Sequence, residues 1–303
     1  MVTHDIRCVD ILLLIHISGD DDLQERLHAL CEEFRDVFSN ELPKEPARIP
    51  EFNLLVDNEK WRVRKNRDGP RTQSAVKQSA LFKTVKTLLK QGIIEYSQSA
   101  HYSQILMVPK PDGTFRMCVD YRALKDCTPD ASWPIPNIAE MPRRIGTQKP
   151  KIFGIGQLAS GVQSFRVILQ APLTYATRAY TSFITFSGVY QFTRLPFGPK
   201  RAPSYFQEIM VTIVLVGLIH MICEMYIDDC QVFGANNDEF VTRLRSILLR
   251  FRKHNLYLKA SRCYFGYSEL EFVGKVYLMK DSKCPVKRFS RYSIFSYPLW
   301  ANN

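Results

Sequence analysis

The stretch MICEMYIDDCQVF (residues 221–233) sets two adjacent aspartates, Asp228 and Asp229, inside an apolar run that is typical of β-strands. No basic residue lies within this stretch, so burying both carboxylates there would be costly. Two interpretations remain open on these residues alone. The pair lies on the solvated bend of a hairpin, or it binds a divalent cation such as Mg²⁺, which prefers oxygen ligands.

A second hairpin is predicted upstream of this stretch. Residues 105–108 and 115–119 have strand character, and the Pro-Asp-Gly sequence at 111–113 is typical of the turn between them. Lys110 lies at one shoulder of the hairpin, and Arg116 lies on the returning strand. From the residue types alone, these two cations belong to a solvated hairpin face.

Apolar residues at helical spacing predict four helices. The first lies within residues 20–38, the second ends at Gly92, the third starts near Pro203, and the fourth runs from an Asn237 cap to about residue 254. The expected buried stripes of the second and fourth helices are Leu81, Phe82, Val85, Leu88 and Leu89, and Phe240, Leu244, Ile247, Leu248 and Phe251. Because helices and strands are mixed without regular alternation, the pattern predicts an α+β fold.

The charge of the chain is distributed unevenly. The 303 residues carry 41 Lys+Arg and 30 Asp+Glu, a formal net charge of +11. Residues 1–59 hold 5 basic and 14 acidic side chains, a net of −9, so the remainder carries +20. Residues 60–90 alone hold ten basic side chains and one acid, and the helix expected at 237–254 has a basic side. This distribution predicts a polyanionic partner, nucleic acid rather than a membrane.

Cysteine spacing and hydropathy indicate a reduced intracellular protein. The eight cysteines form no CxxC pair, so neither a disulfide framework nor a zinc site is expected. The longest apolar run, within residues 211–223, is too short to cross a bilayer. The start of the chain lacks the pattern of a secretory signal.

Several ordered motifs together resemble the reverse transcriptase of gypsy-type long-terminal-repeat retrotransposons. The resemblance covers approximately residues 22–278. The motifs are VPKPDGTFRMCVDYRALK (108–125), WPIPNI (133–138), LPFGPKRAPSYFQ (195–207), YIDD (226–229), NLYLKASRC (255–263) and LEFVG (270–274). Their order and spacing are far more specific than any one of them.

This resemblance implies a right-hand polymerase fold of the α+β class, with fingers and a palm and with the thumb partial or absent. It divides the chain into an acidic N-terminal extension and linker (residues 1–59), a fingers-like region (60–150), a palm (151–278) and a divergent C-terminal tail (279–303). It implies that the chain is a fragment, or a degenerate copy, of a retrotransposon polyprotein.

The resemblance also implies two-metal nucleotidyl transfer, in which two Mg²⁺ or Mn²⁺ ions activate the primer hydroxyl and hold the triphosphate. Asp228 and Asp229 match two of the three palm carboxylates that hold these ions, so they are expected to be catalytic residues and metal ligands. Lys259 matches the lysine that protonates the departing pyrophosphate; by itself it would be an ordinary surface lysine.

Five further residues match positions that contact the nucleotide or the template in this family. Lys110 and Arg116 match the fingers cations that neutralise the incoming triphosphate. Phe197, Gly198 and Gln207 fall where the family packs against template and nucleotide. Helix capping and core packing are the alternative roles for these three.

One motif departs from the family pattern. The first palm motif reads FGIGQLASGVQS at residues 153–164, and Gln157 occupies the position of the third catalytic aspartate. Val162 replaces the aromatic residue that screens the sugar, and an insertion of about six residues fits within 162–169. Because a neutral amide cannot replace an ionised bridging ligand, impaired catalysis is expected.

The expected function is therefore DNA synthesis on an RNA or DNA template by a reverse transcriptase domain whose chemistry is impaired. The expected partners are a primer–template, deoxynucleoside triphosphates, and a second copy of the chain or other parts of the polyprotein. Two alternatives stay open: a catalytically inactive nucleic-acid-binding or assembly module, and a degenerate relic that does not fold stably. The expected location is the cytoplasm, in a retrotransposon particle with access to the nucleus.

Overall fold

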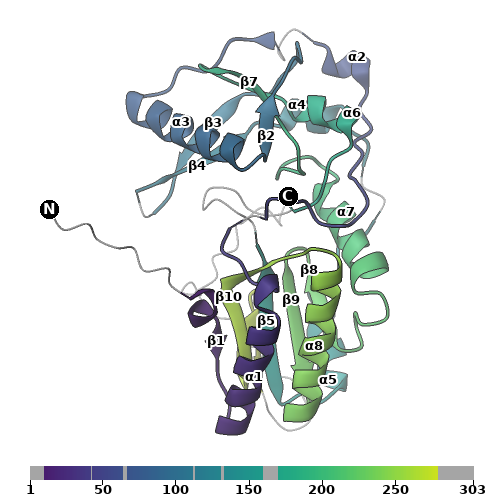
Figure 1. The fold of residues 1–303 in the computed structure, drawn as a ribbon. Helices are drawn as coiled ribbons and strands as arrows, with labels where there is room; N and C mark the ends of the chain where they lie inside the picture. The colour runs from purple at the N-terminus through teal and green to yellow at the C-terminus, as the bar shows by residue number, and fades with distance from the viewer. Residues whose placement is uncertain are drawn as a thin grey trace, which may run out of the picture.

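The chain forms two lobes, which lie one above the other in Figure 1. The structure is a computed structural model that describes residues 10–41, 43–63, 67–111, 113–130, 133–159 and 170–278. A five-stranded sheet forms the centre of the lower lobe, and smaller sheets form the upper lobe. Helix α7 (Ala202–Ile209) lies on one side between the lobes and continues into a π-helical turn (Met210–Val214).

The lower sheet has the strand order β1-β10-β5-β9-β8. Its strands are β1 (His16–Ile17), β10 (Leu258–Tyr267), β5 (Ile152–Leu158), β9 (Asp229–Gly234) and β8 (Cys223–Tyr226). All neighbouring strands are antiparallel except β1, which runs parallel to β10. The register places Gln157 of β5 and Tyr226 of β8 on either side of Asp229, so the predicted site lies at one end of the central strands.

Each face of the lower sheet packs against its own cluster of apolar side chains. Helices α1 (Asp21–Glu33) and α8 (Asn237–Lys253) cover one face (Figure 1). Helix α5 (Met141–Thr147) and the hairpin β11–β12 (Glu269–Phe272, Lys275–Leu278) cover the other, where Met141 and Phe272 pack on Phe153 and Phe233. This arrangement buries both faces and leaves the end with the two aspartates open to the upper lobe.

The predicted helices of the lower lobe are confirmed, with one shift at a cap. Asp20 caps α1 by accepting a hydrogen bond from the backbone N–H of Leu23 at 2.8 Å. The five residues of the predicted α8 stripe are all buried. The cap of α8 is Asn236 and not Asn237, because the Asn236 side chain accepts from the N–H of Glu239 at 2.9 Å. The Asn237 amide instead donates to Asp20 of α1.

The acidic N-terminal segment is part of the lower lobe rather than a separate extension. A 3₁₀ turn (Ile11–Leu14) leads into β1, and a second (Arg35–Val37) follows α1. Glu33 pairs with Arg245 of α8 at 2.5 Å, and Asp36 pairs with Arg252 at 2.5 Å. Two arginines on the basic side of α8 therefore meet carboxylates of the same chain.

The upper lobe is assembled from two separate parts of the chain. The first part supplies α2 (Asn58–Trp61), α3 (Ala75–Lys90), β2 (Ile94–Tyr96), the hairpin β3–β4 (Ile105–Pro109, Phe115–Val119) and α4 (Arg122–Asp126). The second supplies α6 (Tyr175–Arg178), a 3₁₀ turn (Ala179–Thr181), β6 (Phe183–Thr185) and β7 (Gly188–Phe192), which pairs with β2. Residues 175–192, expected in the palm, thus lie in the upper lobe, whereas α5, expected in the fingers, packs on the lower sheet.

The predicted hairpin and helix of the upper lobe are present, and the α+β class is confirmed. Strands β3 and β4 pair antiparallel over five residues each. Leu81, Val85 and Leu88 of α3 are buried, but Phe82 is 59% exposed, so its assignment to the stripe was wrong. Phe82 lies on the far side of a helix whose packed face is narrow. None of the described helices is both long and apolar enough to span a membrane.

Candidate functional site

The two aspartates lie in and directly after a strained two-residue turn between β8 and β9. Tyr226 and Asp229 close the hairpin as a cross-strand pair, and Ile227 and Asp228 form the turn. Ile227 has φ of 54°, a left-handed conformation that β-branched residues rarely adopt. Its side chain is buried, so the turn is fixed by its surroundings rather than by the preference of isoleucine.

Gln207 of α7 supports this turn from behind. Its side chain is fully buried, its amide nitrogen donates to the carbonyl of Met225 at 3.1 Å, and its amide oxygen accepts from the N–H of Ile227 at 2.9 Å. These bonds join α7 to the residues just before the aspartates. They favour a supporting role for Gln207 over the nucleotide contact expected from sequence.

Gln157 of β5 contacts both aspartates. Its amide nitrogen lies 3.1 Å from Oδ2 of Asp228 and 2.9 Å from Oδ1 of Asp229. Asp229 is only 5% exposed, and Asp228 is half-buried, so the pair does not lie on a freely solvated bend. The backbone also joins the strands here, since the N–H of Leu158 donates to the carbonyl of Asp228 at 2.9 Å.

The donor set at this point does not match a site for two cations. A divalent cation such as Mg²⁺ needs oxygen ligands, and Gln157 presents an N–H₂ group to the carboxylates. No group of three or more His, Cys, Asp or Glu side chains that could hold a metal occurs among the described residues. Both carboxylates accept hydrogen bonds from the Gln157 amide, which occupies the position where the resemblance implies a third carboxylate.

Lys259 lies on β10 of the lower sheet, and the charge of Lys110 on the β3–β4 hairpin acts on it. It follows Leu258, which pairs with Leu158 at the end of β5 next to Gln157. Burial lowers the pKa of Lys259, and the positive charges of Arg262 and Lys110 lower this pKa further. Lys110 belongs to the β3–β4 hairpin of the upper lobe, so its charge lowers the pKa of a lysine that lies on the lower sheet.

The remaining predicted residues lie on other segments around the site. Arg116 is half-buried on β4, opposite Val108. Phe197 is 43% exposed in the segment that leads to α7. Gly198 has φ of 128°, and a Cβ there would lie 2.5 Å from the buried ring of Tyr121, so only glycine fits this close approach.

A buried carboxylate on β8, with two polar partners, was not predicted from the sequence. The side chain of Glu224 on β8 is 1% exposed and accepts two hydrogen bonds from Arg144 of α5, at 2.7 and 3.0 Å. Nδ1 of His220 lies 3.0 Å from the same carboxylate. No sequence signal joins Arg144 to Glu224, because the pairing depends on α5 packing against the edge of the sheet.

Gln170, the first described residue after 160–169, joins two strands of the lower sheet near the site. Its buried amide nitrogen donates to the carbonyls of Ala159 and Tyr257, at 2.8 and 3.0 Å, and its oxygen accepts from the N–H of Tyr257 at 2.8 Å. It therefore joins the end of β5 to the start of β10. Val162 and the predicted insertion within 162–169 lie outside the described residues, as does the tail at 279–303.

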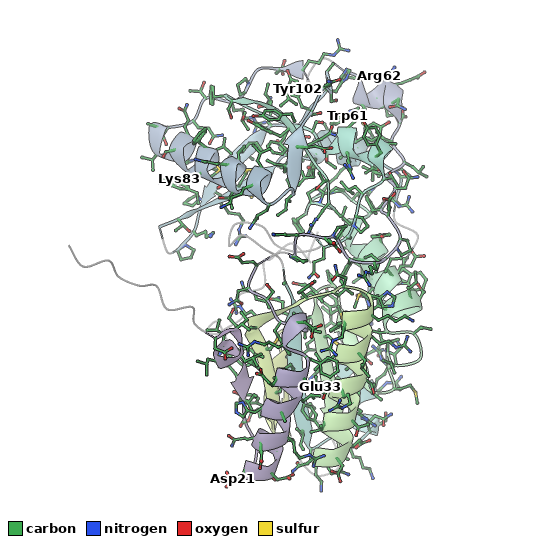
Figure 2. The ribbon with its side chains drawn as sticks, in the orientation of Figure 1. Asp21, Glu33, Trp61, Arg62, Lys83 and Tyr102 are labelled. Carbon is green, nitrogen blue, oxygen red and sulfur yellow. The ribbon has the colours of Figure 1, made fainter. Side chains whose placement is uncertain are left out.

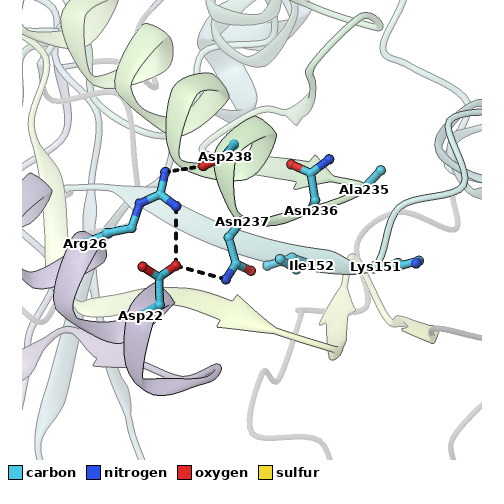
Figure 3. Close-up of a pocket in the computed structure, with 8 residues that line it drawn as sticks. All are labelled: Asp22, Arg26, Lys151, Ile152, Ala235, Asn236, Asn237 and Asp238. Carbon is cyan, nitrogen blue, oxygen red and sulfur yellow. Dashed lines mark hydrogen bonds and ion pairs between the residues drawn. The ribbon is translucent and has the colours of Figure 1, made fainter.

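An open pocket of about 490 Å³ lies at the opposite end of the lower sheet (Figure 3). It is formed between the first turns of α1 and α8, after β9 has ended. Arg26 pairs there with Asp22 at 3.3 Å and with Asp238 at 2.8 Å. Because these charges satisfy one another far from the aspartate pair, this pocket is not part of the candidate site.

The fold and the site define a right-hand polymerase class of protein: two lobes, an antiparallel palm sheet and an aspartate pair on a tight turn between its strands. Residues 108–277 match the family described as reverse transcriptase (RNA-dependent DNA polymerase). The chain belongs to this family.

The chain is similar to parts of longer retrotransposon polyproteins. The Retrovirus-related Pol polyproteins from transposons 412 and opus of Drosophila melanogaster are each 30% identical, over 83% and 91% of this chain. A Tf2-3 polyprotein of Schizosaccharomyces pombe is 28% identical over 83% of the chain. The chain covers only 20%, 27% and 18% of these three proteins, and they agree with the gypsy-type assignment.

Solved structures confirm the polymerase fold. The foamy viral protease-reverse transcriptase in complex with RNA/DNA hybrid has a TM-score of 0.71 and 18% identity, over 89% of this chain and 34% of that one. A form of the same protein in complex with ds DNA has a TM-score of 0.70 and 17% identity, over 89% and 45%. The predicted right-hand polymerase fold is thus correct.

Proposed function

We propose that this domain binds primer and template between its two lobes and synthesises DNA poorly or not at all. One observation carries the proposal: the Gln157 amide donates hydrogen bonds to Asp228 and Asp229, at 3.1 and 2.9 Å, where the chemistry needs a third carboxylate. The proposed binding of primer and template rests on the fold and the family. The proposed loss of DNA synthesis rests on Gln157.

The impairment follows from charge. Reverse transcriptases use divalent metal ions, and we propose Mg²⁺ or Mn²⁺ for an intact member with two ions at the palm carboxylates. Replacing one carboxylate by an amide removes a negative charge where the cations would gather. Losing one well-placed electrostatic group in an active site costs about 10²–10³ in rate. Loss of a metal ligand is expected to cost at least this much.

Cations that are left without acidic partners support the binding of nucleic acid. Lys83, Lys86 and Lys90 lie on the exposed side of α3, and none forms an ion pair with any residue that the structure describes. Lys83 lies at the edge of the upper lobe in Figure 2. Arg245 and Arg252 of α8, in contrast, pair with Glu33 and Asp36. Backbone phosphates are therefore expected to meet the upper lobe first.

The nucleotide contacts remain part of the proposal. Lys110 lies close enough to Lys259 for its charge to lower the pKa of Lys259, and a triphosphate between the two cations would relieve that repulsion. Arg116 shares the hairpin with Lys110 and would add a third cation. These three residues are the proposed contacts of an incoming deoxynucleoside triphosphate.

A paired binding and extension assay tests this function. Wild-type protein should bind a fluorescent poly(rA)–oligo(dT) primer–template by anisotropy, yet extend it at most marginally with Mg²⁺. The Gln157→Asp variant should recover part of the extension, and Gln157→Asn, which keeps the amide, should not. Efficient extension by the wild type would refute the impairment, whereas absence of binding would refute the substrate class.

The inactive-module hypothesis rests on the same contact. If Gln157→Asp combined with deletion of the predicted insertion restores no extension while binding persists, the domain is a binding module without chemistry. A cooperative thermal unfolding transition by circular dichroism would exclude the unfolded relic.

A further inference from the structure

We infer that the Gln157 amide takes the place of a cation between Asp228 and Asp229, so that the turn is held closed without metal and cations must compete with the amide. The inference extends the proposed function and shares its site, but it concerns cation binding rather than nucleic acid. It follows from the geometry of three side chains: Gln157 and Asp229 on neighbouring strands, and Asp228 on the turn before β9.

The amide is placed to serve both carboxylates at once. Gln157 and Asp229 are direct cross-strand partners, and such partners project from the same face of the sheet. The side-chain nitrogen carries two hydrogens, and its two acceptors are Oδ2 of Asp228 and Oδ1 of Asp229. Both donors are therefore used, one for each carboxylate.

Burial makes this contact necessary. Asp229 is 5% exposed and Asp228 is half-buried, so water cannot fully offset the repulsion between neighbouring carboxylates. In an intact site, cations would offset it. Here the positive end of the amide dipole does so through hydrogen bonds to charged acceptors, which are stronger than bonds between neutral groups.

A cation that enters this site must first displace the amide. Gln157 could rotate its amide and offer the oxygen, but the rotation would break both hydrogen bonds and supply one neutral ligand in place of a carboxylate. Cation affinity should therefore be lower than in a variant with a third carboxylate. The expected difference is at least about tenfold, because each lost charge-assisted bond counts against binding.

Two glutamines thus bind different parts of the turn. Gln207 holds the backbone at Met225 and Ile227, and Gln157 holds the two carboxylates. Gln207 alone bonds directly to the left-handed Ile227. Removing Gln157 should deprive both carboxylates of its hydrogen bonds, and an added divalent cation should then restore part of the lost stability.

The test measures cation binding directly on the folded full chain without nucleic acid. Mn²⁺ binding is followed by electron paramagnetic resonance, and unfolding temperatures are compared in EDTA and in millimolar Mn²⁺. Wild type should bind Mn²⁺ weakly and show almost no shift in its unfolding temperature. Gln157→Asp should bind at least about tenfold more tightly and be stabilised by the ion. Gln78→Glu, which adds the same charge on exposed α3, should behave as wild type.

A second variant keeps the test decisive if Gln157→Asp does not fold. Gln157→Ala should be less stable than wild type in EDTA and should gain more stability from Mn²⁺ than wild type does. Mn²⁺ binding by wild type as tight as that of both variants, and lost in Asp228→Asn, would overturn the inference. If wild type binds Mn²⁺ weakly in the absence of nucleic acid and yet extends a primer efficiently, the proposed function alone is refuted. Tight Mn²⁺ binding without extension would refute this inference alone.

Discussion

At the scale of single residues, the turn at Ile227 is held by hydrogen bonds from Gln207 that the hydropathy pattern of the sequence does not predict. Gln207→Met keeps the volume of the side chain and removes both bonds to the turn backbone. Because the carbonyl of Met225 and the N–H of Ile227 then lose buried partners, we expect a loss of about 2–4 kcal/mol in the free energy of unfolding. Urea denaturation measures it, with the exposed Gln78→Met as the matched control. A loss equal to that of the control would show that the turn does not need Gln207.

Gln231 on β9 presents the opposite case. Its side chain is fully buried, and both amide atoms lack a partner within the described ranges. Burying an unpaired amide is unfavourable, so Gln231→Met should stabilise the protein by about 1–2 kcal/mol. Thermal denaturation would show the rise, and a clear fall in stability would mean that the amide has a partner after all.

Lys259 gives the site a dependence on pH. Its pKa in the folded state is lowered, first by burial and then by the charges of Arg262 and Lys110. The unfolded chain therefore binds more protons between the folded and the ordinary lysine pKa, and the contribution of Lys259 to stability rises with pH in that window. The difference in unfolding free energy between wild type and Lys259→Met should show this rise. A pH-independent difference would contradict it.

At the scale of elements, the docking of α1 on α8 joins the acidic and basic parts of the chain. Asp21 and Glu33, the first and last residues of α1, are labelled in Figure 2. Phe34, just after this helix, is fully buried beneath the guanidinium of Arg252, whose Cζ lies 4.1 Å from the ring centroid. The helix is thus held by apolar packing with arginine stacked over it.

Phe34→Ala tests this docking. Removing a fully buried aromatic ring should cost about 3–5 kcal/mol, whereas Leu13→Ala at a position 79% exposed should cost under about 0.5 kcal/mol. Chemical denaturation of the two variants measures the contrast. Equal small losses would show that residues 10–38 are an appendage to the palm.

Both helices were predictable from the sequence, but their pairing was not. Apolar spacing and the cap at Asp20 mark α1, and the stripe from Phe240 to Phe251 marks α8. The basic side of α8 could equally have bound an outside partner. Apolar periodicity identifies the buried face of a helix, but it does not identify which segment packs against that helix. The site could likewise be predicted only in part. Sequence motifs located Gln157, Asp228 and Asp229, but the hydrogen bonds from one amide to both carboxylates depend on the register of the strands.

At the scale of the whole molecule, the charge that remains after internal pairing should decide where nucleic acid binds. Exchanging Lys83, Lys86 and Lys90 of α3 for glutamine should weaken primer–template binding and make the dependence of log K on log salt shallower by up to about 2–3. Exchanging Arg245 and Arg252, which are already paired, should change this slope little. Anisotropy titrations at several salt concentrations provide the comparison. Equal slopes for wild type and the α3 variant would place the nucleic acid elsewhere.

The central claim is that a polymerase fold persists here while the amide of Gln157 blocks its chemistry. The most direct measurement is single-turnover extension of a saturating, pre-bound primer–template by wild type and by Gln157→Asp under the same Mg²⁺ concentration. The account predicts full binding by both proteins, extension by the wild type at or near background, and faster extension by the variant. Rapid extension by the wild type, equal to or above that of Gln157→Asp, would contradict it.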